Sequence, residues 1–175
     1  MIRAALVFGL LAGPASAAEV HFCWAGADGY TMTGTMEFPD ARLDSDRITE
    51  ADVSAFRIDG FHDGRRVGGW SLDQRTPDTT WHLRYAPRTM TFPTGGSFPG
   101  DAGQGWNANG EVTDCGNPGF GFNSGNYAQD VCIDGVWIFD SSIPPETPFT
   151  ATTRPVLPDC SGPALLGKRA RRAVN

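Results

Sequence analysis

The chain has 175 residues, a formal net charge of −6, 22 glycines and 13 prolines. Its twenty acidic residues are spread through the body, whereas four of its fourteen basic residues lie within 168–172. Such an acidic body argues against nucleic acid as a partner. Beyond the N-terminal region no stretch approaches the ~20 apolar residues that cross a bilayer, and we expect no transmembrane segment in the mature chain.

Residues 1–17 have the pattern of a secretory signal peptide. Arg3 supplies a positive charge, residues 4–13 form a short apolar run, and residues 15–17 read Ala-Ser-Ala, a small-residue cleavage site. We therefore expect a mature chain that begins at Ala18. Its location would be extracytoplasmic, either periplasmic or secreted.

Alternating apolar and polar residues predict β-strands along the rest of the chain. From Tyr30 to Phe38, apolar residues or glycine occupy every second position, and threonine or glutamate fills the others. The same period of two recurs from Thr79 to Tyr85, and it places one face in a core and the other in water. The remaining expected strands are 20–24, 53–61, 67–72, 89–92, 119–122, 128–132, 136–139 and 148–153.

Turn residues separate these strands. Asp-Gly or Asn-Gly pairs at 28–29, 63–64, 109–110 and 134–135 suit the positive φ angles of hairpin turns. Only 45–53 looks helical, because Thr49 and Asp52 have the spacing of an N-cap arrangement.

The pattern as a whole predicts an all-β fold: an antiparallel β-sandwich or barrel-like structure with one short helical connector. We expect a single β domain over 18–162 and a disordered basic tail over 163–175. The glycine-rich stretch 93–109 matches no regular element.

The four cysteines predict two disulfide bonds in an exported chain. Three pairings are possible. We favour Cys115 with Cys132, which flank a compact glycine-rich segment, and Cys23 with Cys160, which would tie the first strand to the C-terminal region. Zinc binding is the competing interpretation, but the sequence contains no C-x-x-C spacing, and export disfavours free thiolates.

Candidate ligand-binding residues lie in two glycine- and asparagine-rich loops. Four of the five tryptophans fall in predicted strands and are expected in the core, whereas Trp106 falls in a loop and is the best candidate for an exposed, stacking ring. Asn107, Asn109 and Asn123 could add hydrogen bonds to a ligand. For the segment 115–132, a purely structural loop is favoured over a ligand-contacting one, because glycine alone identifies no chemistry.

No catalytic motif is present: the sequence lacks G-x-S-x-G, H-E-x-x-H, P-loop and G-x-G-x-x-G patterns. His21, His62 and His82 are widely separated, and the acidic residues within 40–50 lack the ligand order of an EF-hand. We expect no metal site and no cofactor. Carboxylate pairs in an acidic protein neither support nor exclude a glycosidase-like site.

The segments Gly29–Phe38, Ser54–Ile58 and Gly69–Leu72 resemble a loose group of uncharacterised exported bacterial β-rich proteins, some of which carry PEP-CTERM sorting tails. The resemblance implies an extracytoplasmic β-rich fold without an assigned activity. The chain departs from the group at its end, where residues 160–169 have an arginine-rich finish without a Pro-Glu-Pro signature or a spanning helix.

These observations favour a non-enzymatic extracytoplasmic module with a binding or envelope-structural role. Its partner would be a carbohydrate or another component of the cell envelope. The alternative is a secreted hydrolase or lyase that acts on polysaccharide through carboxylates near the loops of residues 95–123.

Overall fold

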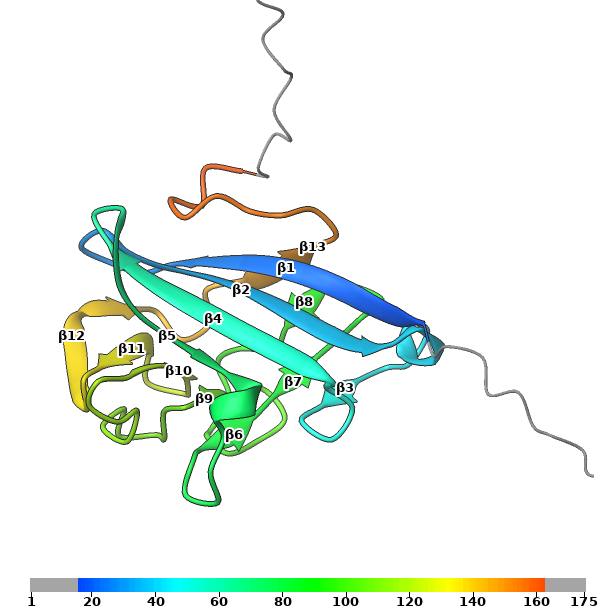
Figure 1. The fold of residues 1–175 in the computed structure, drawn as a ribbon, viewed down its shortest axis with the longest axis horizontal. Coiled ribbons are helices and arrows are strands. Elements are labelled where there is room, and N and C mark those ends of the chain that lie inside the picture. Colours follow the sequence, from blue (N-terminus) through cyan, green and yellow to red (C-terminus); the bar gives the residue numbers. More distant parts are fainter. Residues whose placement is uncertain (1–15, 163–175) are drawn as a thin grey trace, which may run out of the picture.

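The computed structural model describes residues 16–162, which form two facing antiparallel β-sheets (Figure 1). The fold is all-β, as predicted, and the sheets stack as a sandwich without closing into a barrel. Residues 1–15 of the predicted signal peptide and the predicted tail, 163–175, lie outside the described residues. Within 16–162, no helix is long and apolar enough to cross a membrane.

The first sheet has six strands, and its buried face follows the alternation in the sequence. In order across the sheet they are β5 (Arg65–Ser71), β4 (Ala55–His62), β2 (Tyr30–Pro39), β1 (Ala17–Ala25), β13 (Phe149–Thr152) and β8 (Thr91–Phe92). On β2, Met32, Met36 and Phe38 are fully buried. The Asp-Gly pairs at 28–29 and 63–64 have positive φ and close the β1–β2 and β4–β5 hairpins, as expected.

The second sheet has five strands. In order they are β12 (Val136–Ile143), β11 (Gln129–Ile133), β10 (Phe120–Ser124), β9 (Gln104–Trp106) and β6 (Trp81–His82). β9 lies inside the stretch 93–109, for which no strand was predicted. All strand pairs in this sheet are antiparallel.

The strand predicted over 79–85 is broken at Leu83. Its first part is β6, and its second part, β7 (Arg84–Tyr85), pairs instead with β3 (Ile48–Thr49) in a separate two-stranded sheet. At the break, the Leu83 amide donates to Glu50 Oε2 at 3.4 Å. A side chain therefore replaces a strand partner there.

The helix predicted over 45–53 is wrong. This segment holds β3 and turns, and the short helical elements are 3-10 turns elsewhere, η1 (Asp40–Arg42) and η2 (Leu72–Gln74). Thr49 and Asp52 do interact, because the Thr49 amide and hydroxyl donate to Asp52 Oδ2 at 2.9 and 3.1 Å. These bonds close a single turn after β3, so the polar spacing indicated a turn and not a helix start.

A cluster of aromatic side chains fills the space between the sheets. Trp106 is fully buried at its centre. Its ring centroid lies 5.4 Å from that of Phe22 and 4.9 Å from that of Phe56 in the first sheet, and 5.0 Å from that of Phe122 in the second. Aromatic pairs at these separations add stability beyond the area they bury.

The structure contains both expected disulfides, Cys23–Cys160 and Cys115–Cys132. Figure 1 shows residues 153–162, in orange, over β1 on the side away from the second sheet. Cys160 anchors this segment, and the hydroxyl of Thr31 donates to the carbonyl of Pro158 at 2.6 Å. The C-terminal segment therefore covers part of the outer face of the first sheet.

Candidate functional site

Two polar side chains lie buried on the outer face of the second sheet. Along β10 and β11, Phe122 and Val131 belong to the core, whereas their neighbours Asn123 and Asp130 are directly opposite each other on the other face. Outward-facing polar residues of a sandwich are normally wet. Asn123 is only 5% exposed and Asp130 only 3%. A further layer of chain must cover them.

The segments on either side of β9 form this covering layer. A Cβ atom on Gly121 would lie 2.1 Å from the carbonyl oxygen of Asn107, and one on Gly105 would lie 2.3 Å from the ring of Phe98. Real side chains cannot approach so closely, and only glycine at these two positions lets the segments lie flat on the sheet.

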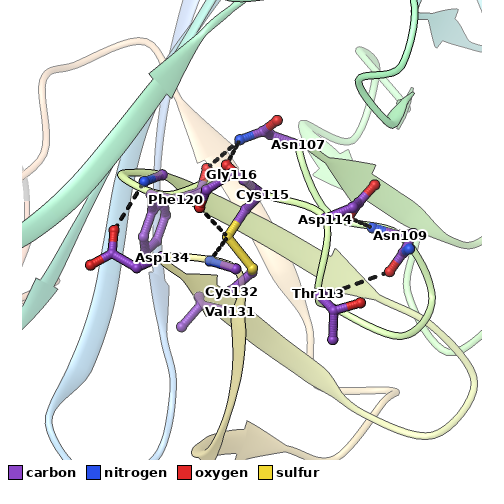
Figure 2. The surroundings of a disulfide bond; sticks show 12 residues. Asn107, Asn109, Thr113, Asp114, Cys115, Gly116, Phe120, Val131, Cys132 and Asp134 are labelled. Carbon is purple, nitrogen blue, oxygen red and sulfur yellow. Dashed lines mark hydrogen bonds between the residues drawn. A yellow bond between two sulfur atoms is a disulfide. The ribbon is translucent and has the colours of Figure 1, made fainter.

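Figure 2 shows how residues 107–119 are held in place. The Asn107 amide donates to the carbonyl oxygens of Cys115 and Phe120 at 2.9 and 3.0 Å. The disulfide to Cys132 ties the same segment to β11. The covalent link and the two hydrogen bonds hold a stretch without regular structure against the sheet, and the segment can act as a fixed wall.

A pocket of about 360 Å³ opens between this segment and the β10–β11 turn. Phe98 and Val112 contribute apolar walls, the turn contributes residues 125–128, and Asn123 and Asp130 contribute polar groups from the sheet. Small-molecule sites typically have this composition, an apolar lining with a few placed polar groups, and this volume is at the lower end of their range.

Asp130 is the buried titratable group of the pocket. Its carboxylate accepts hydrogen bonds from Asn123 Nδ2 at 3.3 Å, Trp137 Nε1 at 2.9 Å and the Ser142 hydroxyl at 3.4 Å. Burial raises the pKa of Asp130, and these three hydrogen bonds offset only part of that effect. A carboxyl group with a raised pKa inside a pocket is typical of functional sites.

Aromatic side chains surround the mouth of the pocket. Tyr127 is 90% exposed, and Trp137 is 43% exposed although its indole N–H is anchored to Asp130. The ring of Phe139 lies 5.4 Å from that of Trp137 and is also exposed, but it does not line the pocket. Exposed aromatic rings beside a polar cavity can stack on a flat ligand.

The structure separates the four ligand-binding residues predicted from sequence. Trp106 is 0% exposed, and the prediction of an exposed ring there is wrong. The Asn107 side chain holds the covering segment in place through its hydrogen bond to Cys115. Asn109 Oδ1 accepts a hydrogen bond from the Glu111 amide at 3.0 Å within a turn. Only Asn123 lines the pocket.

Sequence reasoning missed Asp130, Tyr127 and Trp137. Trp137 lies in a predicted strand and was expected in the core, but β12 is the edge strand of its sheet and leaves the ring half open to solvent. A signal for Asp130 was available in the alternation of β11. That alternation could not show that a distant segment covers the same face.

The other candidate groups occupy separate places. His21 lies 2.9 Å from Glu19, His62 stacks on Tyr30, and His82 contacts the carbonyl oxygen of Gly100. In residues 16–162, no three His, Cys, Asp or Glu side chains are grouped so that they could hold a metal ion. All four cysteines are in disulfides, which removes the zinc interpretation.

Within the acidic stretch 40–50, two carboxylates pair with arginines: Asp46 with Arg88 at 2.8 Å, and Glu50 with Arg84. Glu50 is also near His82, at 4.0 Å. Burial alone would raise the pKa of Glu50, but hydrogen bonds from the backbone, including the Leu83 amide, together with the pairing with Arg84, lower it. This stretch is therefore part of an ion-pair network, which the sequence pattern did not indicate.

In comparisons with known proteins, no family model matches the chain, and no curated protein and no solved structure is significantly similar to it. The geometry of the pocket therefore carries the functional argument.

Proposed function

We propose that the protein is an exported glycan-binding module whose pocket holds one sugar unit. One juxtaposition supports this proposal: exposed Tyr127 and Trp137 flank a pocket that contains the buried polar side chains of Asn123 and Asp130. A sugar ring has an apolar C–H face and a hydroxylated edge. The face can stack on an aromatic ring while the hydroxyl groups donate to the amide and the carboxylate.

The charge of the pocket favours a neutral ligand. Of the described residues that line it, none is basic, whereas Glu111 and Asp130 are acidic. An anionic ligand would therefore meet like charge without a compensating cation. Most glycan units carry no charge and satisfy this condition.

Export fits this role. Two disulfides persist in an oxidising compartment, which agrees with the predicted signal peptide and with a partner in the cell envelope or outside the cell. The net negative charge of the chain does not exclude a partner of this kind.

The test is a titration of the purified protein with soluble cello-, xylo-, manno- and chito-oligosaccharides. Binding is monitored by tryptophan fluorescence. The other four tryptophans are buried, so a ligand in the pocket should act on Trp137. We expect a saturable signal for at least one series. The substitution Trp137→Ala removes this fluorescent reporter, so its affinity is measured by isothermal titration calorimetry. Binding should be about tenfold weaker, the equivalent of about 1.4 kcal/mol.

Leu43→Ala is the control, because Leu43 is an exposed apolar residue that does not line the pocket. It should leave the affinity unchanged. If no oligosaccharide binds at millimolar concentration, the proposal is wrong.

A second candidate function is hydrolysis of a polysaccharide, which the raised pKa of Asp130 favours because a general acid must keep its proton near neutral pH. Glu111 is a second carboxylate in the same pocket. New reducing ends released from an oligosaccharide, and their loss in Asp130→Asn, would show this activity. Binding without turnover would leave the module non-enzymatic.

A further inference from the structure

We propose that two copies of the chain pair along β12 and form a twofold-symmetric dimer with one continuous sheet. The pairing surface is the free edge of β12, where apolar side chains are exposed and where the strand is complementary to itself in one register. Pairing of this kind goes beyond the proposed function and does not depend on it.

The outer edge of β12 is free in the described part of the chain. There β12 pairs only with β11, and Figure 1 shows it, in yellow, at the margin of the second sheet. The backbone N–H and C=O groups of successive residues in a strand point alternately to its two sides. The two-residue turn at 134–135 closes the hairpin, so Val136 and Ile138 direct these groups to β11. Those of Trp137 and Phe139 therefore point to the free side.

The side chains on this edge are apolar and exposed. Six large apolar side chains are exposed in residues 16–162, and three of them lie here: Val136 at 58%, Trp137 at 43% and Phe139 at 69%. Residues 134–143 contain neither lysine nor proline, which commonly prevent edge strands from pairing. The first half of β12 is therefore open to a partner strand.

The second half of β12 is less available. The strand pairs with β11 at Ile138 and again at Ile143, with an irregular stretch in between. In that stretch the Ser141 carbonyl oxygen accepts a hydrogen bond from the Ala27 amide at 3.1 Å. A partner strand can therefore use the edge only over residues 136–140.

The backbone groups of this short edge allow a self-complementary register. In a twofold antiparallel pair, the axis passes through one residue, which lies opposite its own copy. With the axis at Ile138, Trp137 and the partner's Phe139 are opposite each other and exchange two hydrogen bonds, and the symmetric pair exchanges two more. Asp140 then lies opposite the partner's Val136, so no carboxylate faces another.

The neighbouring registers are less favourable. With the axis at Trp137, Asp140 would lie opposite the partner's Asp134, and like charges directly opposite each other destabilise a sheet. With the axis at Phe139, Trp137 would need the backbone groups of the partner's Ser141, whose carbonyl oxygen is already bonded. The first register has neither conflict.

The same register brings four aromatic rings together. Within one chain the ring centroids of Trp137 and Phe139 are 5.4 Å apart. Directly opposite residues share a face of the sheet, so the partner's Phe139 would lie beside Trp137. Because Trp137 lines the mouth of the pocket, each copy would add one ring to the rim of the other's pocket.

The size of the surface sets the expected strength of pairing. The exposed parts of Val136, Trp137 and Phe139 amount to roughly 300 Å² per protomer, since a large aromatic side chain has about 150–250 Å². With the strand backbones, a pair would bury on the order of 1,000 Å², the lower limit for a specific interface. We therefore expect a reversible dimer that forms at micromolar concentrations.

Sedimentation equilibrium of the mature chain from about 5 to about 500 µM tests this. The average mass should rise with concentration and level off at twice the monomer mass. Phe139→Asp places a carboxylate beside the partner's Trp137 and should weaken association at least about tenfold. Leu43→Asp is the matched control, because Leu43 is also exposed, at 45%, and lies far from β12 in the sequence. Equal melting temperatures would show that both variants fold.

Two cysteine variants test the register. Ile138 would lie opposite its own copy in a non-hydrogen-bonded pair, about 4.5 Å apart at Cα, which suits a disulfide. Val136, on the same face, would be about 13 Å from its copy along the strand. All native cysteines are paired, so each variant has one free thiol. On air oxidation, Ile138→Cys should give at least about tenfold more covalent dimer than Val136→Cys.

Each other result overturns the proposal. A monomer at every concentration would show that the edge of β12 does not pair. Equal association of Phe139→Asp and Leu43→Asp would place the interface elsewhere. A mass that keeps rising beyond the dimer would show an open association instead of a twofold pair. Equal cross-linking of the two cysteine variants would reject the register. None of these results would exclude glycan binding by a single chain.

Discussion

Asn123 and Asp130 are paired across the β10–β11 ladder, and the hydrogen bond from Asn123 Nδ2 to Asp130 Oδ1, 3.3 Å long, leaves Asn123 Oδ1 without a partner. The carboxylate thus selects one of the two orientations of the amide. Because it can only accept hydrogen bonds while ionised, the amide must turn its N–H₂ group toward it.

The substitution Asp130→Asn should reverse that orientation. Trp137 Nε1 and the Ser142 hydroxyl both donate to Asp130 Oδ2, so the new amide must place its oxygen there and its N–H₂ group toward Asn123. Asn123 would then turn its oxygen inward to accept. We expect calorimetry to show at least a fivefold loss of affinity for the oligosaccharide that the wild type binds. Asp140→Asn, an exposed change on β12, is the control, and equal affinities in the two variants would contradict this mechanism.

The raised pKa of Asp130 predicts a specific pH dependence of stability. The folded protein holds this proton more tightly than the unfolded chain, whose carboxyl group titrates at the ordinary value of 3.8. As pH rises from 3.8 through the raised folded value, this group therefore lowers the free energy of unfolding, and the effect levels off above it.

Asp130→Asn removes the titration. Urea unfolding should be measured for the wild type and the variant at closely spaced pH values. Over that interval, the unfolding free energy of the wild type should fall relative to that of the variant. If the difference between the two unfolding free energies does not change with pH, burial does not raise the pKa of Asp130.

Truncation of Trp106 should lower the unfolding free energy more than truncation of Trp137. Trp106→Ala opens a cavity among the rings of both sheets and should cost about 3–5 kcal/mol of unfolding free energy. Trp137→Ala removes a half-exposed ring and one hydrogen bond to Asp130 and should cost about 1–2 kcal/mol. Guanidinium unfolding measures both. Similar losses in the two variants would conflict with the observed burial.

Removal of either disulfide should lower stability, but only removal of Cys115–Cys132 should weaken ligand binding. Cys115→Ser with Cys132→Ser should lower the unfolding free energy by about 3 kcal/mol and also weaken ligand binding, because the covering segment forms a pocket wall. Cys23→Ser with Cys160→Ser should lower stability by a similar or larger amount and leave the affinity of the folded protein unchanged. Loss of binding in the second pair alone would place the ligand elsewhere.

Export can be checked by mass. Protein recovered from the periplasm or medium of a bacterial host should have the mass of a chain that begins at Ala18. Alkylation should add four groups only after reduction. A retained leader would contradict the predicted cleavage before Ala18, and thiols that react without reduction would contradict the two disulfides.

Local patterns predicted the sheets well, because period-two alternation and Asp-Gly turns act over a few residues. The β1–β2 and β4–β5 hairpins follow directly from the alternation at 30–38 and the turns at 28–29 and 63–64. The same logic failed at 45–53, where a polar spacing of three suits a helix cap and a closed turn equally. Propensity alone does not distinguish the two.

The pocket depends on contacts between distant residues, which local patterns do not contain. Trp106 looked exposed because it sits among glycine and asparagine, yet β9 carries it into the core between two sheets. Asn123 was identified only as one of several asparagines near the loops. Its pairing with Asp130 required the hairpin register, and its burial required the segments on either side of β9 to fold back over the sheet.

Gly105 and Gly121 have a consequence for the evolution of binding. At Gly121 the covering segment lies directly on the backbone of the second sheet, and at Gly105 the Phe98 ring does, so the missing side chains set the height of the pocket. Any larger residue at position 121 would act as a spacer under the carbonyl of Asn107 and raise the whole segment, while the disulfide kept its far end attached. The size of ligand admitted could thus change in small steps at two positions that never touch the ligand.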